Sequence, residues 1–168
     1  MIFVRWQFPL LARMIIAGML VMGSTHASSN NPSDSFSFKH LNIENGLSSN
    51  IITKIIEDSY GFIWIATQNG LNRFDGSNIV TFFYEPSDSG SIPNNDISSL
   101  AVDHAGNLWI GTKSGLCRFN YETEKFEKHL QYGPGERNYI TSLYVDRKDI
   151  VWVGTEHESK KAGSILFK

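Results

Sequence analysis

The chain has 168 residues, a length that suits one domain, and its 15 Lys+Arg and 17 Asp+Glu give a formal net charge of −2. Without a basic surplus, the sequence lacks the electrostatic footprint of a nucleic-acid-binding protein. Hydrophobic residues at 41% exclude global disorder, and one cysteine excludes an internal disulfide or a cysteine-cluster zinc site.

The first 27 residues have the layout of a secretory signal peptide. Arg5 and Arg13 occur there without any acidic residue, about ten apolar residues follow, and small residues precede a cleavage site at Ala27. An uncleaved membrane anchor is the alternative, but a helix of about ten residues rises only ~15 Å, half of a bilayer core. We therefore expect export to the periplasm with cleavage after Ala27, followed by a flexible linker over 28–35.

The rest of the chain, residues 36–168, contains a repeat whose copies align on three tryptophans. Trp64 and Trp109 are 45 residues apart, and Trp109 and Trp152 are 43 apart. The aligned segments read NIITKIIEDSYGFIWIATQNGLNRF, NDISSLAVDHAGNLWIGTKSGLCRF and NYITSLYVDRKDIVWVGT. Self-similarity at such a period is typical of repeat architectures. The expected repeats span about 50–94, 95–137 and 138–168.

The repeats share a set of structural residues at common offsets. An Asp begins a tight turn that ends on Gly, because the carboxylate caps the turn and Gly tolerates positive φ. A Trp fills the space between sheets, a small residue lets the neighbouring backbone approach, and a Thr hydroxyl satisfies a turn amide. These residues are Asp58, Gly61, Trp64, Thr67 and Gly70; Asp103, Gly106, Trp109, Gly111, Thr112 and Gly115; and Asp146, Trp152, Gly154 and Thr155.

Alternating apolar positions, β-branched residues and glycine turns predict four short strands in each repeat. Fourth strands are expected at Val80–Tyr84 and Lys125–Leu130, and residues 36–41, FSFKHL, resemble the second of these. A four-stranded unit that recurs every 43–45 residues is typical of a β-propeller blade. We predict an all-β partial β-propeller of about two and a half to three four-stranded blades, plus an orphan N-terminal outer strand.

The third repeat departs from the other two. Asp149 stands where the turn of the other copies ends on Gly, which predicts a less relaxed turn. Five additional residues follow Thr155 before the next Gly, so the sequence does not define the strand that follows. Because propellers close with typically 4–8 blades, we expect either the product of a truncated gene or an arc that assembles with other copies.

The segments IEDSYGFIWIATQNGLNRFDG and AVDHAGNLWIGTKSGLCRFN resemble the two-component regulator propeller repeat. The resemblance covers about residues 36–155. It implies a periplasmic sensor region, joined through a membrane helix to a histidine kinase, hybrid kinase or diguanylate cyclase. The chain is then expected to be a ligand-sensing propeller segment of a two-component or cyclic-di-GMP receptor, without its membrane and output domains and without enzymatic activity of its own.

Little in the sequence could carry catalysis, so we expect no catalytic residue, no metal and no cofactor. His157 with Glu156 and Glu158 could bind a metal, but consecutive residues on a strand point to opposite faces. Cys117 has no identifiable base and is expected to be a small, semi-buried thiol. The alternative function is that of a fragment of a secreted β-propeller enzyme, a lyase or a glycan-active protein, which would need a convergent cluster of His or acidic residues.

The sequence leaves the ligand-binding residues unknown. The expected partners are a small molecule or oligosaccharide and either the remaining propeller blades or other copies of the chain, with no nucleic acid. Tyr60, Tyr132 and Tyr139 could stack on sugars or could pack at the rim. His40 and His129 occupy matching outer-strand positions, which favours a structural role for both.

Overall fold

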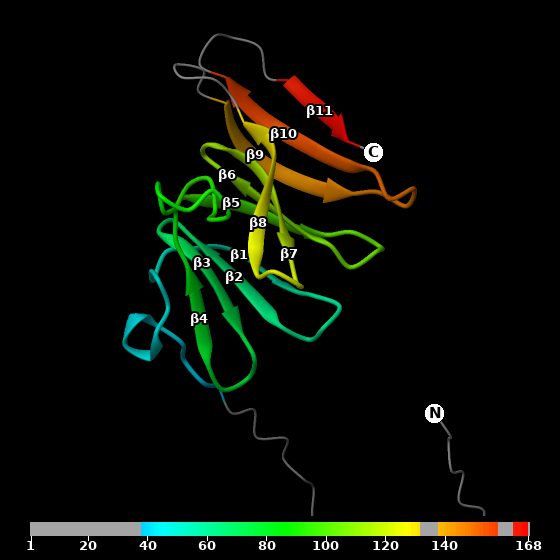
Figure 1. Cartoon of the computed structure of the whole chain (residues 1–168). Helices are drawn as coiled ribbons and strands as arrows, with labels where there is room; N and C mark the ends of the chain where they lie inside the picture. Colours follow the sequence, from blue (N-terminus) through cyan, green and yellow to red (C-terminus); the bar gives the residue numbers. More distant parts are fainter. Residues whose placement is uncertain (1–37, 132–137, 158–162, 168) are drawn as a thin grey trace, which may run out of the picture. The chain divides into compact units, whose positions relative to one another are not determined.

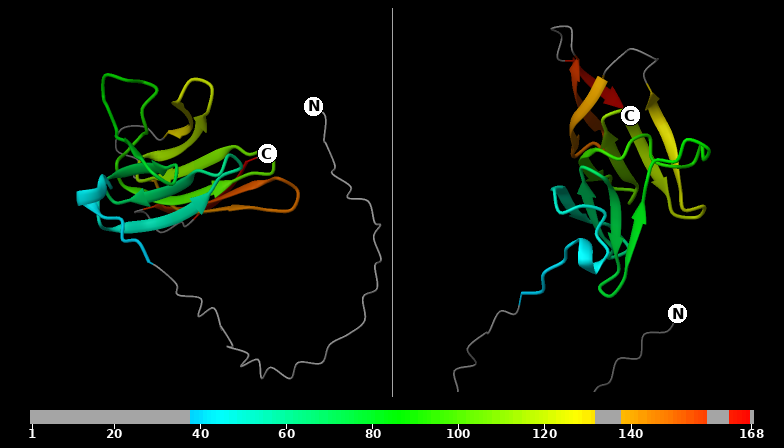
Figure 2. Two further views of the ribbon diagram at one scale, coloured as in Figure 1. Left: turned by 90° about the horizontal axis from the view of Figure 1, so that it is seen from below. Right: turned by 90° about the vertical axis from the view of Figure 1, so that its left-hand side faces the viewer.

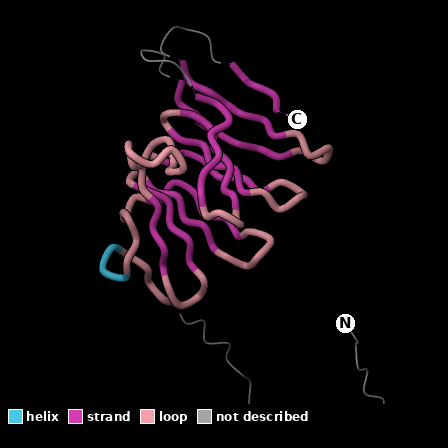
Figure 3. Tube along the Cα trace, in the orientation of Figure 1, coloured by secondary structure: helices cyan, strands magenta, loops and turns pink. Residues whose placement is uncertain are grey.

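The computed structural model describes residues 38–131, 138–157 and 163–167, and nearly all of their regular structure is antiparallel β-sheet (Figure 1, Figure 3). A short 3₁₀ helix, η1 (Ile43–Asn45), precedes the first strand. It begins at Asn42, whose side chain accepts hydrogen bonds from the backbone amides of Glu44 and Asn45. The predicted signal peptide and linker lie outside the described residues, and no helix among those described is long and apolar enough to span a bilayer.

Each repeat folds as one meander, because every strand pairs with its neighbour in sequence. The first sheet contains β1 (Ile52–Glu57), β2 (Ile63–Thr67), β3 (Gly70–Phe74) and β4 (Ile79–Phe82). The second sheet contains β5 (Ile97–Val102), β6 (Leu108–Thr112), β7 (Gly115–Asn120) and β8 (Lys125–Gln131). The third sheet contains β9 (Asn138–Val145), β10 (Val151–His157) and β11 (Gly163–Phe167).

The three sheets stack on one another in chain order, with their first strands side by side (Figure 1, Figure 2). Strand β5 lies between β1 and β9. The Thr53 hydroxyl donates to the carbonyl of Ile97 at 2.7 Å, and the Leu143 amide donates to the Ser99 hydroxyl at 3.0 Å. Successive blades of a propeller are arranged in this way, so the prediction of an all-β partial β-propeller is confirmed.

The hydrophobic core consists of two layers, because alternate side chains of a sheet point to opposite faces. Between the first and second sheets, Trp64 is 0% exposed, and its ring lies 4.9 Å from that of Phe119. Between the second and third sheets, Trp109 packs with Ile140 and Val153. Burial of each such large apolar side chain contributes about 1.5–3 kcal/mol, so the repeat tryptophans join the sheets.

The structure differs from the prediction at the ends of the repeats. The outer strand expected over 36–41 is not formed: Phe38–Leu41 have no regular secondary structure, and residues 36 and 37 lie outside the described part. The physical reason is that β4 already occupies the outer edge of the first sheet, which leaves that segment no edge there. In the third repeat, β11 forms after the additional residues. Asp149 adopts φ 63°, the left-handed conformation that its turn requires.

Candidate functional site

The three repeat aspartates begin the turns that connect the first and second strands of the sheets. These turns lie together on one side of the stack, on the right in Figure 1. In each repeat the carboxylate Oδ2 accepts a hydrogen bond from the indole nitrogen of the tryptophan six residues later. The pairs are Trp64 and Asp58 at 2.6 Å, Trp109 and Asp103 at 2.9 Å, and Trp152 and Asp146 at 3.0 Å.

Asp58 is buried and has a hydrogen-bond partner on each carboxylate oxygen. Its Oδ1 accepts from the backbone amides of Tyr60 and Phe62 at 2.9 and 3.0 Å, and its Oδ2 also accepts from the Tyr121 hydroxyl at 2.8 Å. Tyr121 belongs to the following repeat, so this carboxylate also links two sheets. Burial raises the pKa of the Tyr121 phenol strongly, and the hydrogen bond to Asp58 adds to the effect.

Asp103 occupies the same position in the second repeat. Its carboxylate accepts from the backbone amide of Asn107 at 2.8 Å and from the Asn107 side-chain nitrogen. Burial raises the pKa of Asp103, but the hydrogen bonds from Trp109 and Asn107 outweigh burial and hold the pKa below its ordinary value of 3.8. The group is therefore ionised at neutral pH.

Neighbouring turns contact one another from sheet to sheet. The His104 amide donates to Asp149 Oδ1 at 2.8 Å, and the His104 Nδ1 lies 3.4 Å from the same oxygen. Gly106, with φ 85°, faces Ser59 so closely that an added Cβ would lie 2.6 Å from the serine hydroxyl. The aspartate turns therefore form a continuous rim along this side of the stack.

The repeat threonines lie at the opposite ends of the second strands. Thr67 Oγ1 donates to the carbonyl of Gly70 at 2.8 Å and accepts from the amide of Asn69 at 3.0 Å. Thr112 makes the same pair of bonds, to Gly115 and Ser114. The hydroxyl closes the hairpin that leads to the third strand, so these threonines have a structural role. The other residues of the repeat motif also lie in turns or strands of the sheets: Gly61, Gly111, Gly154 and Thr155.

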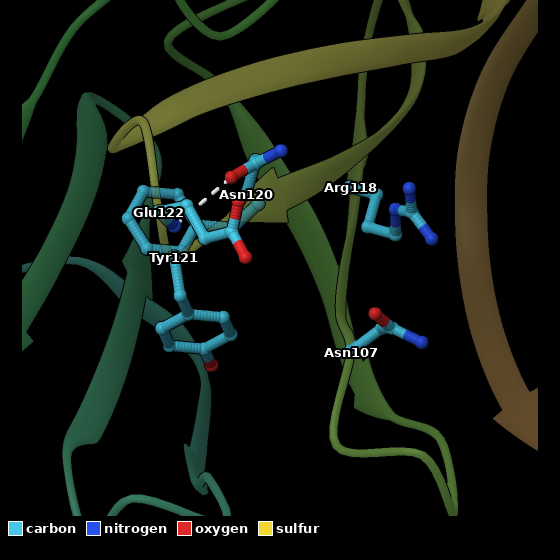
Figure 4. A pocket seen from close by; sticks show the side chains of 6 residues that line it. Asn107, Arg118, Asn120, Tyr121 and Glu122 are labelled. Atoms are coloured by element: carbon cyan, nitrogen blue, oxygen red, sulfur yellow. Dashed lines mark hydrogen bonds between the residues drawn. The ribbon is translucent and has the colours of Figure 1, made fainter.

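A cavity of about 270 Å³ opens on the second sheet beside the aspartate turns (Figure 4). Asn107 and Arg118 lie on one side of it, and Asn120, Tyr121 and Glu122 on the other. A second cavity, of about 290 Å³, is lined by residues of the second and third sheets. Its lining consists of Asp103, Asn107, Trp109, Arg118, His129, Asp149 and Val151. Because both cavities include Asn107 and Arg118, we call the two together the Arg118 site.

The Arg118 site combines a paired cation with a neutral imidazole. The Arg118 guanidinium donates to Glu127 at 2.6 Å and lies 6.0 Å from the centre of the Trp109 ring. The His129 ring packs 5.0 Å from the same indole. Burial lowers the pKa of His129, and nearby Arg118 lowers it further against the opposing effect of Glu127. Hydrogen bonds from Asn120 and Arg118 lower the pKa of Glu127.

The described residues offer little chemistry beyond binding. No group of three or more His, Cys, Asp or Glu side chains within them could hold a metal ion. Cys117 is 0% exposed rather than semi-buried, and burial raises the pKa of its thiol far above the ordinary value. Its side chain faces the core between the first two sheets. Of the residues that the sequence analysis named around His157, Glu158 and the side chain of His157 lie outside the described residues.

Of the tyrosines named from the sequence, Tyr60 lies in the first aspartate turn and Tyr139 lies in β9. Tyr60 is 66% exposed and packs 4.5 Å from the ring of Tyr121, Tyr139 is half-buried, and Tyr132 lies outside the described residues.

The sequence analysis did not identify Arg118 as a candidate. A signal was present, because an Arg follows the repeat Trp by nine residues in both complete repeats, at Arg73 and Arg118.

The two component regulator propeller family model matches three segments, residues 46–69, 91–114 and 135–157. Histidine kinase P4 of Formosa agariphila is 39% identical over 57 residues, which are 34% of this chain and 4% of that protein. A crystal structure from B. thetaiotaomicron, the extracellular domain of a protein described as the hybrid two component system BT3049, is 33% identical. It aligns with a TM-score of 0.62 over 77% of this chain and 20% of that one.

The chain thus spans a small part of both relatives. A second extracellular domain from B. thetaiotaomicron, that of BT4673, aligns with a TM-score of 0.37 at 21% identity. The three matched segments cover the aspartate turn and the tryptophan strand of every sheet. The chain belongs to the two component regulator propeller family, and its repeats form successive blades of a β-propeller.

Proposed function

We propose that this chain is the ligand-sensing part of an exported receptor that signals through two-component phosphotransfer or cyclic-di-GMP. The observation that carries the proposal is the 33% identity and common fold with the extracellular domain of BT3049. An extracellular domain that precedes an output module has to recognise something outside the cell. The periplasmic location and the kinase or cyclase output of the whole receptor are parts of this proposal.

The Arg118 site is the place we propose for the ligand. It supplies the amides of Asn107 and Asn120 as donors and acceptors, beside the His129 ring and the Arg118 guanidinium. The Arg118 guanidinium is already paired with Glu127, so its remaining N–H groups are suited to hydroxyl oxygens rather than to an anion. This combination favours a neutral, hydroxyl-rich ligand such as an oligosaccharide.

Titration of the purified chain with maltohexaose, cellohexaose and a tri-galacturonate tests this proposal, with isothermal calorimetry and tryptophan fluorescence as readouts. We expect at least one neutral sugar to bind and the uronate to be rejected, because Asp103, Asp149, Glu122 and Glu127 surround the site. Failure of every neutral sugar to bind at millimolar concentration, or preference for the uronate, would contradict this assignment.

The chain contains its own matched control. Arg73 pairs across from Trp64 as Arg118 pairs across from Trp109, and it forms an ion pair with Glu124 at 2.9 Å. Arg118→Met keeps the packing of the stem and removes the donors, so binding should weaken by about tenfold or more, the effect of ~1.4 kcal/mol. Arg73→Met should leave affinity unchanged, and equal losses in both variants would place the ligand elsewhere.

A further inference from the structure

The two cavities of the Arg118 site are small for an oligosaccharide. Their volumes are about 270 and 290 Å³, whereas ligand pockets usually measure ~300–1,000 Å³, so each cavity encloses only part of such a ligand. The indole of the site is not a stacking surface, because Trp109 is only 9% exposed. Further sugar units, and an aromatic ring on which they stack, therefore have to lie beside the cavities.

An exposed tyrosine lies next to the smaller cavity, on the side of the first sheet. Tyr121 lines this cavity (Figure 4), and the centre of its ring lies 4.5 Å from that of Tyr60 in the first aspartate turn. Tyr60 lies beyond the lining residues and is 66% exposed. The ring of Tyr60 thus continues the wall that Tyr121 begins, and it presents an apolar surface to solvent.

One buried carboxylate holds both tyrosines in place. The Tyr60 amide donates to Asp58 Oδ1 at 2.9 Å, and the Tyr121 hydroxyl donates to Oδ2 of the same group at 2.8 Å. Asp58 is itself fixed by the indole N–H of Trp64. Because the pair of rings is already ordered, a ligand that covers Tyr60 immobilises little that was free before, which lowers the entropic cost of binding.

The other repeats show that the turn does not require a tyrosine. The position of Tyr60 is occupied by Ala105 in the second turn and by Lys148 in the third. All three turns nevertheless contain the same hydrogen bond, from the amide four residues after the aspartate to its Oδ1. A large apolar ring that is mostly exposed, and that its turn does not need, is better explained by a ligand than by folding.

The surroundings of Tyr60 suit a neutral ligand. The Asp58 carboxylate beside it is saturated, because four donors from the turn, the indole and Tyr121 occupy its two oxygens. Toward the third sheet, by contrast, Asp103 and Asp149 line the other cavity. A neutral sugar carries hydroxyls around its edge and C–H groups on its faces. It therefore matches a polar cavity that adjoins an amphipathic tyrosine ring.

We propose that Tyr60 is the stacking surface for a sugar unit that extends out of the Arg118 site toward the first sheet, so that the site selects oligosaccharides over short sugars. This inference rests on the function proposed above, which places a neutral oligosaccharide in the Arg118 site. The Arg118 site supplies the polar contacts, and Tyr60 supplies the face of its ring. Affinity should therefore rise with the length of the sugar until the ligand reaches Tyr60.

Calorimetric titration with sugars of two lengths tests this inference. Maltohexaose and cellohexaose are compared with maltose and cellobiose, and the hexaose of the preferred series should bind more tightly than its disaccharide. Tyr60→Ala should weaken binding of the hexaose by about tenfold and leave that of the disaccharide unchanged, because only the longer sugar reaches the ring. The variant should fold, since Ala105 occupies this position in the second turn. Tyr60→Phe should retain the affinity, because it keeps the ring.

Tyr84→Ala is the matched control. Tyr84 is 44% exposed and follows β4 at the end of the first sheet where Phe82 pairs with Leu71, beside the threonine hairpin and away from the aspartate turns. This variant should bind both sugars as the unmodified chain does. An unchanged affinity of Tyr60→Ala for the hexaose, or equal losses for both lengths, would overturn the role of Tyr60 and leave the Arg118 site standing. An unmodified chain that binds neither length would overturn the Arg118 site and this inference with it.

Discussion

The indole nitrogen of Trp64 lies 2.6 Å from Oδ2 of Asp58 and donates a hydrogen bond to it across the turn between β1 and β2. The bond orients the largest side chain of the layer between the first two sheets, where the ring meets Phe82 and Phe119. The same bond recurs in both other repeats. Each blade thus fixes the orientation of its tryptophan through a hydrogen bond to its own turn.

Trp64→Ala should lower the free energy of unfolding by about 3–5 kcal/mol, because it empties a large core position. Trp64→Phe should cost less, since it keeps an aromatic ring and removes the N–H that bonds to Asp58. Equilibrium urea titrations measure both values. If the two variants lost the same stability, the ring would contribute nothing beyond its hydrogen bond.

Much of the fold was predictable because the repeat is periodic. The 45- and 43-residue spacing of the tryptophans placed the sheets, and the turn that begins at Asp58 ends on Gly61 as expected. The bond from the indole to the aspartate was missed, although its six-residue offset is constant. From the sequence, the tryptophan was considered only as a bulky side chain that fills space. Its indole N–H also needs a hydrogen-bond acceptor when the ring is buried.

The Arg118 site could not be derived from sequence, because it depends on contacts between sheets. His129 is an extra residue where the β7–β8 register shifts, and this shift brings its ring onto Trp109. No local pattern reveals that bulge. The strand expected over 36–41 failed for a similar reason, since a fourth-strand sequence forms a strand only beside an available edge.

Asp103 should make stability dependent on pH on the acid side. Its pKa in the folded chain lies below the ordinary value of 3.8, so its stabilisation is fully present above that value and is lost as the pH falls through the lower, folded-state pKa. Asp103→Asn should reduce the loss of unfolding free energy at acid pH. It should also lower the unfolding free energy at neutral pH by about 1.5–3 kcal/mol. Urea titrations between about pH 2 and pH 7 compare the curves. If the unfolding free energies of the unmodified chain and of Asp103→Asn fell in parallel as the pH fell, Asp103 would not be a source of the pH dependence.

Gly111→Ala should destabilise the chain by about 1–3 kcal/mol, the usual cost of overpacking. The new Cβ would lie 2.5 Å from Cγ2 of Ile140, a branched side chain fixed between two sheets. Gly154→Ala is the control, because its closest neighbour is the Ser142 hydroxyl, which can rotate away. Thermal unfolding should show a larger loss of stability for Gly111→Ala than for Gly154→Ala. The reverse order would contradict close packing between Gly111 and Ile140 of the third sheet.

Cys117 should not react with a thiol reagent in the folded chain. It is 0% exposed, and burial keeps the thiol protonated, whereas the thiolate is the reactive form. Labelling by a chromogenic disulfide at pH 8 should therefore require opening of the first two sheets and should become rapid in denaturant. Trp64→Ala, which loosens the same layer, should accelerate labelling under native conditions. Rapid labelling of the unmodified chain would show that this layer is open.

The segment before Ser28 should be removed on export. Its two arginines, apolar run and small residues before the cleavage site match the layout that signal peptidase recognises. Mass spectrometry of the exported protein should find Ser28 as the first residue. Ala27→Leu should block cleavage, because the −1 position accepts only a small side chain, and Ala17→Leu within the apolar run should not. An exported chain that retains Met1 would show that the segment remains attached as an anchor.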